Sequence, residues 1–211
     1  MGASVPAVGA DGTIYVKGED RLYALSPEGA RKWSYRVFNP NGSPIIGNDG
    51  TVYVGGGYGF YAINPDGTLK WVKQLGDNCG DSAAVAADGT VYVSGGFLYS
   101  IAPGGEMLWH QGDFLTSSPV IGNSGSIYVR GYYDHRLFAY TSAGQELWKC
   151  LPDTNRYSFP TCPAVGSDGA LYYTSSNAVW AVTSQGEILW SVAGKGSGGE
   201  DAIFPLGKNH T

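Results

Sequence analysis

The residues that could carry chemistry are few, and their spacing builds no recognisable catalytic or metal centre. Histidine occurs only at His110, His135 and His210, and none has the short spacing to another histidine or cysteine that metal ligands show. Two aspartates flank Cys79, but they lack the alternating oxygen ligands of a calcium loop. Phosphate-binding loops and the Gly-x-Ser-x-Gly elbow are absent. We therefore expect a protein that is not an enzyme and holds no metal or cofactor.

The three cysteines do not form a framework. Cys79, Cys150 and Cys162 are an odd number without paired spacing, which argues against disulfide scaffolding and against zinc. Free cysteines usually pack as small apolar side chains. A bridge between Cys150 and Cys162 across one loop stays open as the main exception.

Two stretches combine arginine and tyrosine in a way that suits binding. Residues 130–136 and 152–158 are the largest departures from an otherwise regular pattern, and Tyr and Arg are enriched at interface hot spots. The alternative is that longer surface loops are merely tolerated. The candidate ligand- or partner-binding residues are Arg130, Tyr132, Tyr133, His135, Arg136, Asp153, Asn155, Arg156 and Tyr157.

A second candidate set consists of small polar residues at equivalent points of a repeat. They recur at the start of the first strand, where side chains can approach a central channel. Either they satisfy local backbone groups, or they present one hydrogen-bonding group per repeat to an axial ligand. The set is Ser4, Ser43, Ser82, Ser118 and Cys162.

The elements that must position these residues come from a sequence repeated five times. One copy runs from Gly47 through an Asp-Gly turn and two apolar strands to Trp71. Every copy has Asp-Gly or Ser-Gly early and a glycine four residues before a tryptophan. A period near 40 residues with strand-like content is typical of a propeller blade.

Each repeat predicts four antiparallel strands. A short apolar run, mostly with proline at its start, leads into the Asp-Gly turn, for which we expect a two-residue type I′ hairpin. A β-branched and aromatic strand such as 13–16 follows, then a strand such as 22–25 that is apolar on both faces, and then the tryptophan strand. No stretch shows a helical period.

Composition excludes several classes. Gly accounts for 33 of 211 residues, charged residues for 15%, and the net charge is −5. Binding of nucleic acid requires a basic stripe on the protein surface, so we expect no nucleic-acid partner. No apolar run is long enough to span a bilayer, so we expect no membrane span. We also expect no signal peptide, because no charged and apolar leader precedes the first repeat. The sequence assigns no compartment.

The repeat resembles that of pyrroloquinoline-quinone-type (PQQ-like) β-propellers. The matching motifs are Asp-Gly-Thr-Val-Tyr-Val, Leu-Tyr-Ala-Leu and Pro-Asp-Gly-Thr-Leu-Lys-Trp, over roughly residues 3 to 193. The resemblance implies that the tryptophan packs between adjacent blades. The family includes calcium- and quinone-dependent dehydrogenases as well as non-catalytic scaffolds and sensor domains, and it usually has more than five blades. The docking tryptophans would be Trp33, Trp71, Trp109, Trp148 and Trp190.

These observations predict an all-β, closed propeller of five blades with four antiparallel strands each. It spans residues 1–193 and is followed by a Gly-rich tail, 194–211, with a possible closing strand; the alternative is a fragment of a larger propeller. We expect a monomeric, non-catalytic binding or scaffold module for a protein or small ligand. The alternatives are a lectin-like carbohydrate-binding propeller and a PQQ-dependent dehydrogenase. The variable loops lie on one side of the predicted disc, where binding residues tend to be placed.

Overall fold

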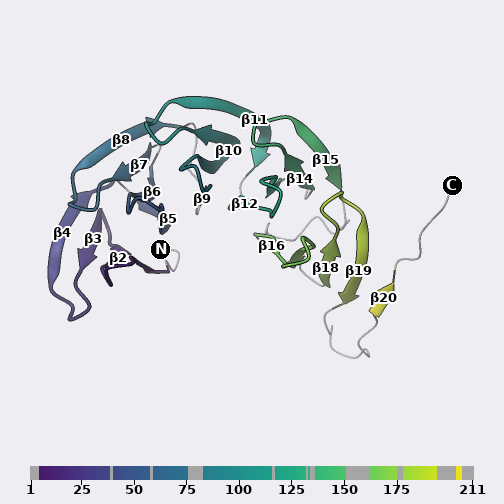
Figure 1. The fold of residues 1–211 in the computed structure, drawn as a ribbon, viewed down its shortest axis with the longest axis horizontal. Coiled ribbons are helices and arrows are strands. Elements are labelled where there is room, and N and C mark those ends of the chain that lie inside the picture. The colour runs from purple at the N-terminus through teal and green to yellow at the C-terminus, as the bar shows by residue number, and fades with distance from the viewer. Residues whose placement is uncertain are drawn as a thin grey trace. The chain divides into compact units, whose positions relative to one another are not determined.

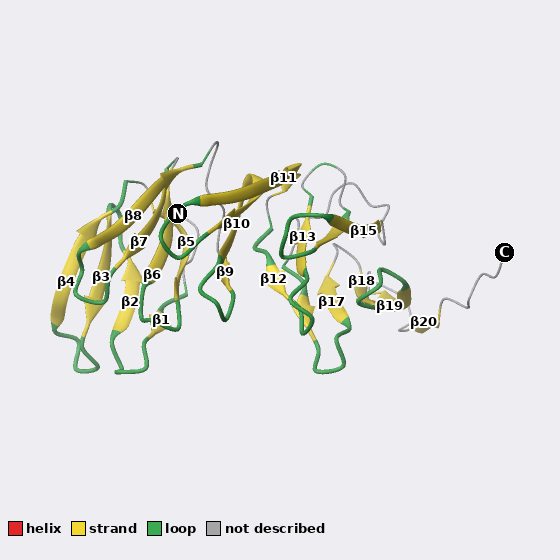
Figure 2. Ribbon diagram, turned by 45° about the horizontal axis from the view of Figure 1, so that its top comes forward, coloured by secondary structure: helices red, strands yellow, loops and turns green. Residues whose placement is uncertain are grey.

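The computed structural model describes residues 5–38, 40–57, 59–75, 83–115, 117–131, 133, 136–150, 162–174, 178–193 and 203–205. In this part of the chain every regular element is a β-strand and none is a helix (Figure 2). The strands form five antiparallel sheets of a β-propeller, and within each sheet the neighbours follow chain order (Figure 1). The all-β, five-repeat expectation is therefore confirmed. Closure of the five repeats into a ring stays a prediction.

The chain divides into two compact units, residues 1–118 and 119–211. The strands of the first unit are β1 (Ala7–Val8), β2 (Ile14–Lys17), β3 (Arg21–Leu25) and β4 (Arg31–Arg36); β5 (Pro40–Ile46), β6 (Val52–Gly56), β7 (Gly59–Ile63) and β8 (Leu69–Gln74); β9 (Ala83–Val85), β10 (Val91–Ile101) and β11 (Met107–Leu115). The strands of the second unit are β12 (Val120–Ile121), β13 (Ile127–Arg130), β14 (Leu137–Tyr140) and β15 (Glu146–Cys150); β16 (Ala164–Val165), β17 (Leu171–Thr174), β18 (Ala178–Val182), β19 (Ile188–Ala193) and β20 (Ile203–Pro205).

Two sheets depart from the four-strand count without breaking the repeat. In the third sheet β10 pairs with β9 through Val91–Val93 and with β11 through Gly96–Ile101. It therefore supplies both the second and the third strand of its repeat, bending at Gly96, whose φ is +83°. In the fifth sheet β20 adds a further strand outside β19. The predicted tail segment is thus paired, but on the outer edge and not as the innermost strand of a sixth repeat.

The Asp-Gly turns differ from the type I′ hairpins that we expected. In the first sheet the Gly12 N–H donates to the Gly9 carbonyl at 3.0 Å, and the Gly9 N–H donates to the Thr13 carbonyl at 2.8 Å. Gly12 has φ +79°, whereas Asp11 has no positive φ. A type I′ turn needs positive φ at both central residues, so these are type I turns closed by a left-handed glycine. The turns between third and fourth strands repeat the same bonds.

The tryptophan of each fourth strand docks onto the turn of the following sheet within its unit. The Trp33 Nε1–H donates to the Pro65 carbonyl at 2.8 Å. A Cβ added to Gly67 would lie 2.7 Å from the Trp33 ring, so glycine is needed there for close approach as well as for its φ of +88°. The equivalent Gly29 of the first repeat has nothing within 4 Å. One glycine thus serves both the turn and the contact between sheets.

The same docking recurs in both units. Trp71 donates to the Pro103 carbonyl at 2.9 Å, and Trp148 donates to the Ser184 carbonyl at 2.9 Å. The glycines equivalent to Gly67 lie against both rings. The predicted docking role is confirmed for these tryptophans. Each tryptophan also packs on a tyrosine of its own sheet, with ring centroids 5.7 to 5.9 Å apart: Tyr15–Trp33, Tyr53–Trp71, Tyr92–Trp109, Tyr128–Trp148 and Tyr172–Trp190.

The core lies between adjoining sheets of the same unit. Leu22 and Ala24 of the first sheet pack with Val54 of the second. Leu137 of the fourth sheet packs with Tyr173 of the fifth. The third strand of the second sheet, β7, is buried on both faces apart from one half-buried residue, whereas β3 alternates buried and half-buried residues and Val179 in β18 is 40% exposed.

Candidate functional site

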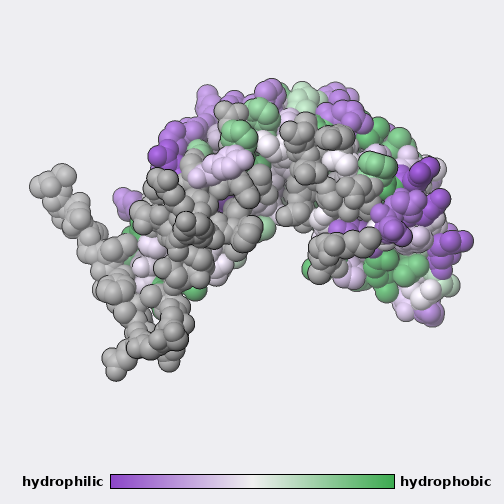
Figure 3. All heavy atoms as spheres, turned by 180° about the vertical axis from the view of Figure 1, so that it is seen from behind, coloured by the Kyte–Doolittle hydropathy of each residue, from purple (hydrophilic) through white to green (hydrophobic). Residues whose placement is uncertain are grey.

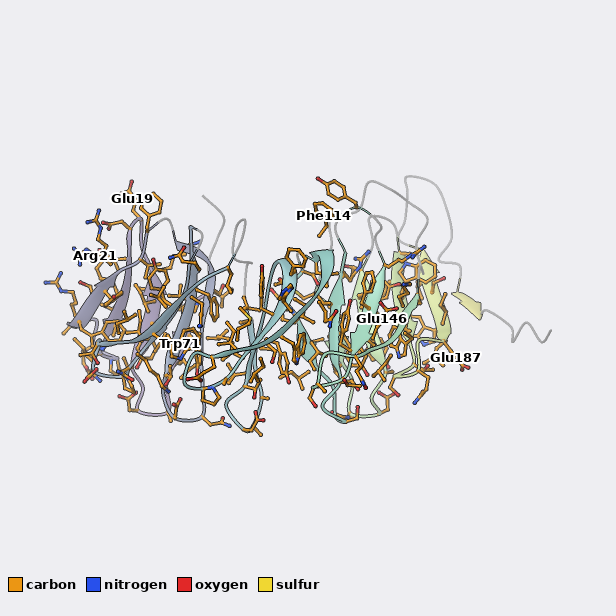
Figure 4. All side chains as sticks on the ribbon, turned by 90° about the horizontal axis from the view of Figure 1, so that it is seen from above. Glu19, Arg21, Trp71, Phe114, Glu146 and Glu187 are labelled. Carbon is orange, nitrogen blue, oxygen red and sulfur yellow. The ribbon has the colours of Figure 1, made fainter. Side chains whose placement is uncertain are left out.

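The two ends of each sheet differ in their connections: one end has varied loops and the other has uniform glycine turns. The loop side is the end where the second strand passes to the third and where the fourth strand leaves the sheet; in the first sheet it comprises residues 18–20 and 37–38. The turn side is the opposite end, with the left-handed glycine turns. Figure 4 shows Glu19 and Arg21 at the loop side of the first unit, with Phe114 extending beyond the sheet on that same side.

Arg130 does not lie on the loop where the sequence placed it. It is the last residue of β13, and its side chain is fully buried. The guanidinium lies 4.9 Å from the centroid of the Tyr173 ring, and Nη1 donates to the Thr174 carbonyl at 3.3 Å. Thr174 is the last residue of β17. Arg130 therefore links the loop-side end of β13 in the fourth sheet to the loop-side end of β17 in the fifth. Because its side chain is fully buried, Arg130 is not available for direct contact with a partner.

The predicted loop after Arg130 is closed at its base by a backbone hydrogen bond. The Gly131 N–H donates to the Arg136 carbonyl at 3.0 Å. Tyr133 is 68% exposed, and Arg136 is half-buried. The structure thus brings Arg130, Tyr133 and Arg136 onto one loop and its base. The other candidates lie outside the described residues: Tyr132, His135, Asp153, Asn155, Arg156 and Tyr157.

Among the recurring small polar residues, Ser43 serves a backbone group. The Ser43 hydroxyl accepts a hydrogen bond from the Val5 N–H at 2.9 Å, which links the first two sheets. Ser118 is half-buried and Cys162 is exposed. Ser4 and Ser82 lie outside the described residues. The bond to Ser43 favours the local backbone interpretation of this set over the axial ligand.

Both described cysteines are free thiols. Cys150 is half-buried, Cys162 is exposed, and no bridge joins them. Burial raises the pKa of Cys150 to about 11, which the nearby Arg130 charge partly opposes. A thiol with so high a pKa is a poor nucleophile at neutral pH. Within the described ranges no three His, Cys, Asp or Glu side chains gather where they could hold a metal ion.

The loop side of the third sheet carries a feature that the sequence did not reveal. Gly96 pairs with Leu115 and Leu98 pairs with Gln111, so residues 112–114 bulge opposite Phe97. Phe114 has φ +55° and is 58% exposed. Left-handed backbone is costly for a non-glycine residue and often marks a functional position. In the sequence, the sign that could have indicated this bulge is Gly112 at its start, which has φ +73°.

Next to the bulge, aromatic rings meet at the surface. The Phe97 ring lies 5.4 Å from the His110 ring and 6.0 Å from the Tyr99 ring, both edge-on. Phe97 is 36% exposed, whereas Tyr99 is buried. Edge-to-face packing of this kind fixes ring orientation. The third sheet therefore presents oriented aromatic surface on its loop side.

On the turn side of the first two sheets, charged groups stabilise the turns themselves. Asp49 accepts from the Thr51 N–H at 3.0 Å, from the Thr51 hydroxyl at 2.8 Å and from Lys70 at 2.9 Å. Chiefly the Lys70 hydrogen bond lowers the Asp49 pKa to about 2. Asp11 makes equivalent bonds with Thr13 and Lys32, and its pKa is also about 2. These groups are engaged in turn structure.

The fold and the repeat define a β-propeller of the quinone-type repeat class. Residues 1–135 match the family described as outer membrane protein assembly factor BamB, and this is more than half of the chain, so the protein belongs to that family. A search of curated proteins finds no match.

Solved structures with the same fold include proteins of different function. BamB from Moraxella catarrhalis has TM-score 0.73 and 17% identity, over 90% of this chain and 61% of that one. Virginiamycin B lyase from Staphylococcus aureus has TM-score 0.72 and 13% identity, over 96% of this chain and 83% of that one. A streptogramin B lyase has TM-score 0.70 and 16% identity, over 91% and 68%. The chain thus spans about three fifths of the length of the BamB structure, and such identities show the fold alone.

No helix among the described residues is long and apolar enough to cross a membrane. In Figure 3, hydrophilic and hydrophobic residues lie side by side on the described surface.

Proposed function

We propose that the protein is a non-catalytic scaffold that binds another protein through the loop side of its sheets. The observation that carries this proposal is the exposure of large aromatic side chains there. Phe38 is 69% exposed, Phe114 is 58% exposed and Tyr133 is 68% exposed, each at a loop-side end of its sheet. Exposed aromatics that can become buried supply much of the binding energy of protein interfaces.

The opposite side offers a contrast that supports the same proposal. Its turns carry Asp11, Asp49 and Asp66, whose pKa values are lowered by hydrogen bonds, first of all from Thr13, Lys70 and Thr68 respectively. Groups that already stabilise a turn have less to offer a partner. Membership of a family named for an assembly factor also fits a scaffold role.

The binding surface proposed for the second unit is the loop set predicted from the sequence. Tyr133 and Arg136 are its described members, with Arg130 positioning the loop bases. Its further members are Tyr132, His135, Asp153, Asn155, Arg156 and Tyr157. The scaffold role requires no cofactor.

A photo-crosslinking amino acid placed at Tyr133 tests this surface in cells of the native source. The matched control places it at Glu187, an exposed residue on the turn side of the same unit. We expect a discrete crosslinked partner from position 133 and none from 187, and we expect Tyr133→Ala to weaken capture of that partner by the intact chain. Crosslinking from position 187 alone would mean that the wrong side was chosen.

Enzyme and lectin assays test the non-catalytic part of the proposal. Reconstitution with quinone and calcium should give no dye-linked oxidation of alcohols or sugars, and incubation with streptogramin B should leave it intact. A glycan array should show no binding. Turnover in either enzyme assay would overturn the proposal, and specific glycan binding would replace the protein partner with a carbohydrate.

A further inference from the structure

The outer edge of the fifth sheet is covered by a strand from the tail. β20 lies beside β19 (Figure 1), antiparallel to it, with Trp190 opposite Pro205, Ser191 opposite Phe204 and Val192 opposite Ile203. The ladder is three residues long. It therefore marks a place where the outer edge of a propeller sheet accepts an additional strand.

The other outer strands of the described chain end their sheets. β4, β8 and β15 each pair on their inner side only, within four-stranded sheets. An edge strand presents unpaired N–H and C=O groups, which are a template for another strand. In the fifth sheet, by contrast, β20 of the same chain pairs with the outer strand β19.

The resident strand is poorly made for permanent pairing. Pro205 has no backbone N–H, so it cannot donate in the ladder whichever way its nitrogen faces. Prolines occur at sheet edges for this reason. A three-residue strand that contains proline offers fewer backbone hydrogen bonds than an ordinary strand of five or six residues. A longer strand without proline would pair with β19 more completely.

We propose that the outer edge of β19 is a strand-addition site for an extended segment of a partner protein, and that Ile203–Pro205 is a placeholder which the partner displaces. Main-chain hydrogen bonds to β19 would supply the affinity. Apolar residues of the partner at the two positions opposite Trp190 and Val192 would supply selectivity, because directly opposed residues interact across a ladder. This site is separate from the loop side, so it stands or falls independently of the proposed function.

The probe for this site is a labelled synthetic peptide with the sequence of residues 202–207, in which the proline is replaced by valine (P205V). Its binding is measured by fluorescence anisotropy against three forms of the full chain. The first is the wild type. The second is I203P/F204P; since successive strand residues direct their N–H groups to opposite sides, this double change removes the inward donor in either register. The third is S191C/F204C, in which an oxidised disulfide joins directly opposed residues and locks the strand.

We expect the displaced form, I203P/F204P, to bind the peptide at least ten-fold more tightly than the wild type. The locked form should not bind until it is reduced. A peptide that is N-methylated at alternate residues should lose binding, since it lacks the ladder donors. Near-ultraviolet circular dichroism checks that each form is folded. Equal binding by the locked and displaced forms, or no binding by a folded displaced form, would overturn the proposal.

Discussion

The first two sheets and the two sheets of the second unit share their docking contact but secure their turns differently. Lys70 in the second sheet donates to Asp49 at 2.9 Å and to Thr51 at 3.0 Å. In the second unit leucines occupy the lysine position, and Leu147 and Leu189 are 49% and 43% exposed. The hydrogen-bonded charge network is therefore not a requirement of the repeat.

The second unit has instead a polar contact deep between its sheets. Arg130 is fully buried over the Tyr173 ring, at a position where the second and third sheets have Gly55 and Ser94. The tryptophan–glycine contact is thus common to both units, whereas these polar groups differ between them. The shared contact should therefore contribute more to stability than either polar group.

The largest loss should come from the shared contact. Trp71→Ala removes a buried ring that fills the space between two sheets, and should lower the free energy of unfolding by about 3 to 5 kcal/mol. Trp148→Ala should cost a similar amount in the second unit. Urea unfolding followed by circular dichroism measures both. A cost for Trp71→Ala no larger than that of Lys70→Met would reverse the ranking.

The next loss should come from the buried arginine. Arg130→Ala removes the ring contact and the bond to Thr174, and should lower the free energy of unfolding by about 2 kcal/mol. Because the Arg130 charge favours the Cys150 thiolate, its removal should also raise the Cys150 pKa above about 11. The pH dependence of alkylation of Cys150 measures this shift. Tyr133→Ala, at an exposed position, is the matched control and should change neither quantity.

A smaller effect should appear in acid. The Asp49 pKa is about 2, below its ordinary value of 3.8, so its bonds stabilise the fold above the ordinary value and are lost as pH falls from there towards 2. Since Asp49 is exposed and Lys70 only half-buried, solvent screens the pair and the loss should be about 0.5 to 1 kcal/mol. Asp49→Asn should remove this part of the pH dependence of unfolding. Lys70→Met should reduce it, and an unchanged profile in both variants would contradict the assignment.

The smallest effect should come from adding the missing lysine to a turn that already has the aspartate and the threonine. The third sheet has Asp88 and Thr90 but Leu108 at the lysine position. Leu108→Lys should add about 0.3 to 0.5 kcal/mol of stability and lower the Asp88 pKa further. Leu147→Lys, where Ser124 stands in place of the aspartate, should add nothing. Equal gains in both variants would show that lysine acts without the aspartate.

The repeat, the strand order and the docking tryptophans could be predicted because each is written in residue types at fixed spacing. The turn type could not, since Asp-Gly suits both a type I′ hairpin and a type I turn with left-handed glycine. Nor could the burial of Arg130, which depends on Tyr173 in another repeat. The bulge that exposes Phe114 depends on cross-strand register, which strand patterns leave undetermined.

The tryptophan–glycine contact has a direction, and this bears on how such chains can change length. Within each unit a repeat gives a ring to the one that follows it, as Trp33 and Gly67 show. Contacts between unlike surfaces can be added head to tail without limit, and only the rotation per step decides whether they close. Duplication or deletion of a whole repeat would therefore leave the chemistry of every remaining junction intact. Copy number can drift within such a family while each junction keeps the same pair of residues.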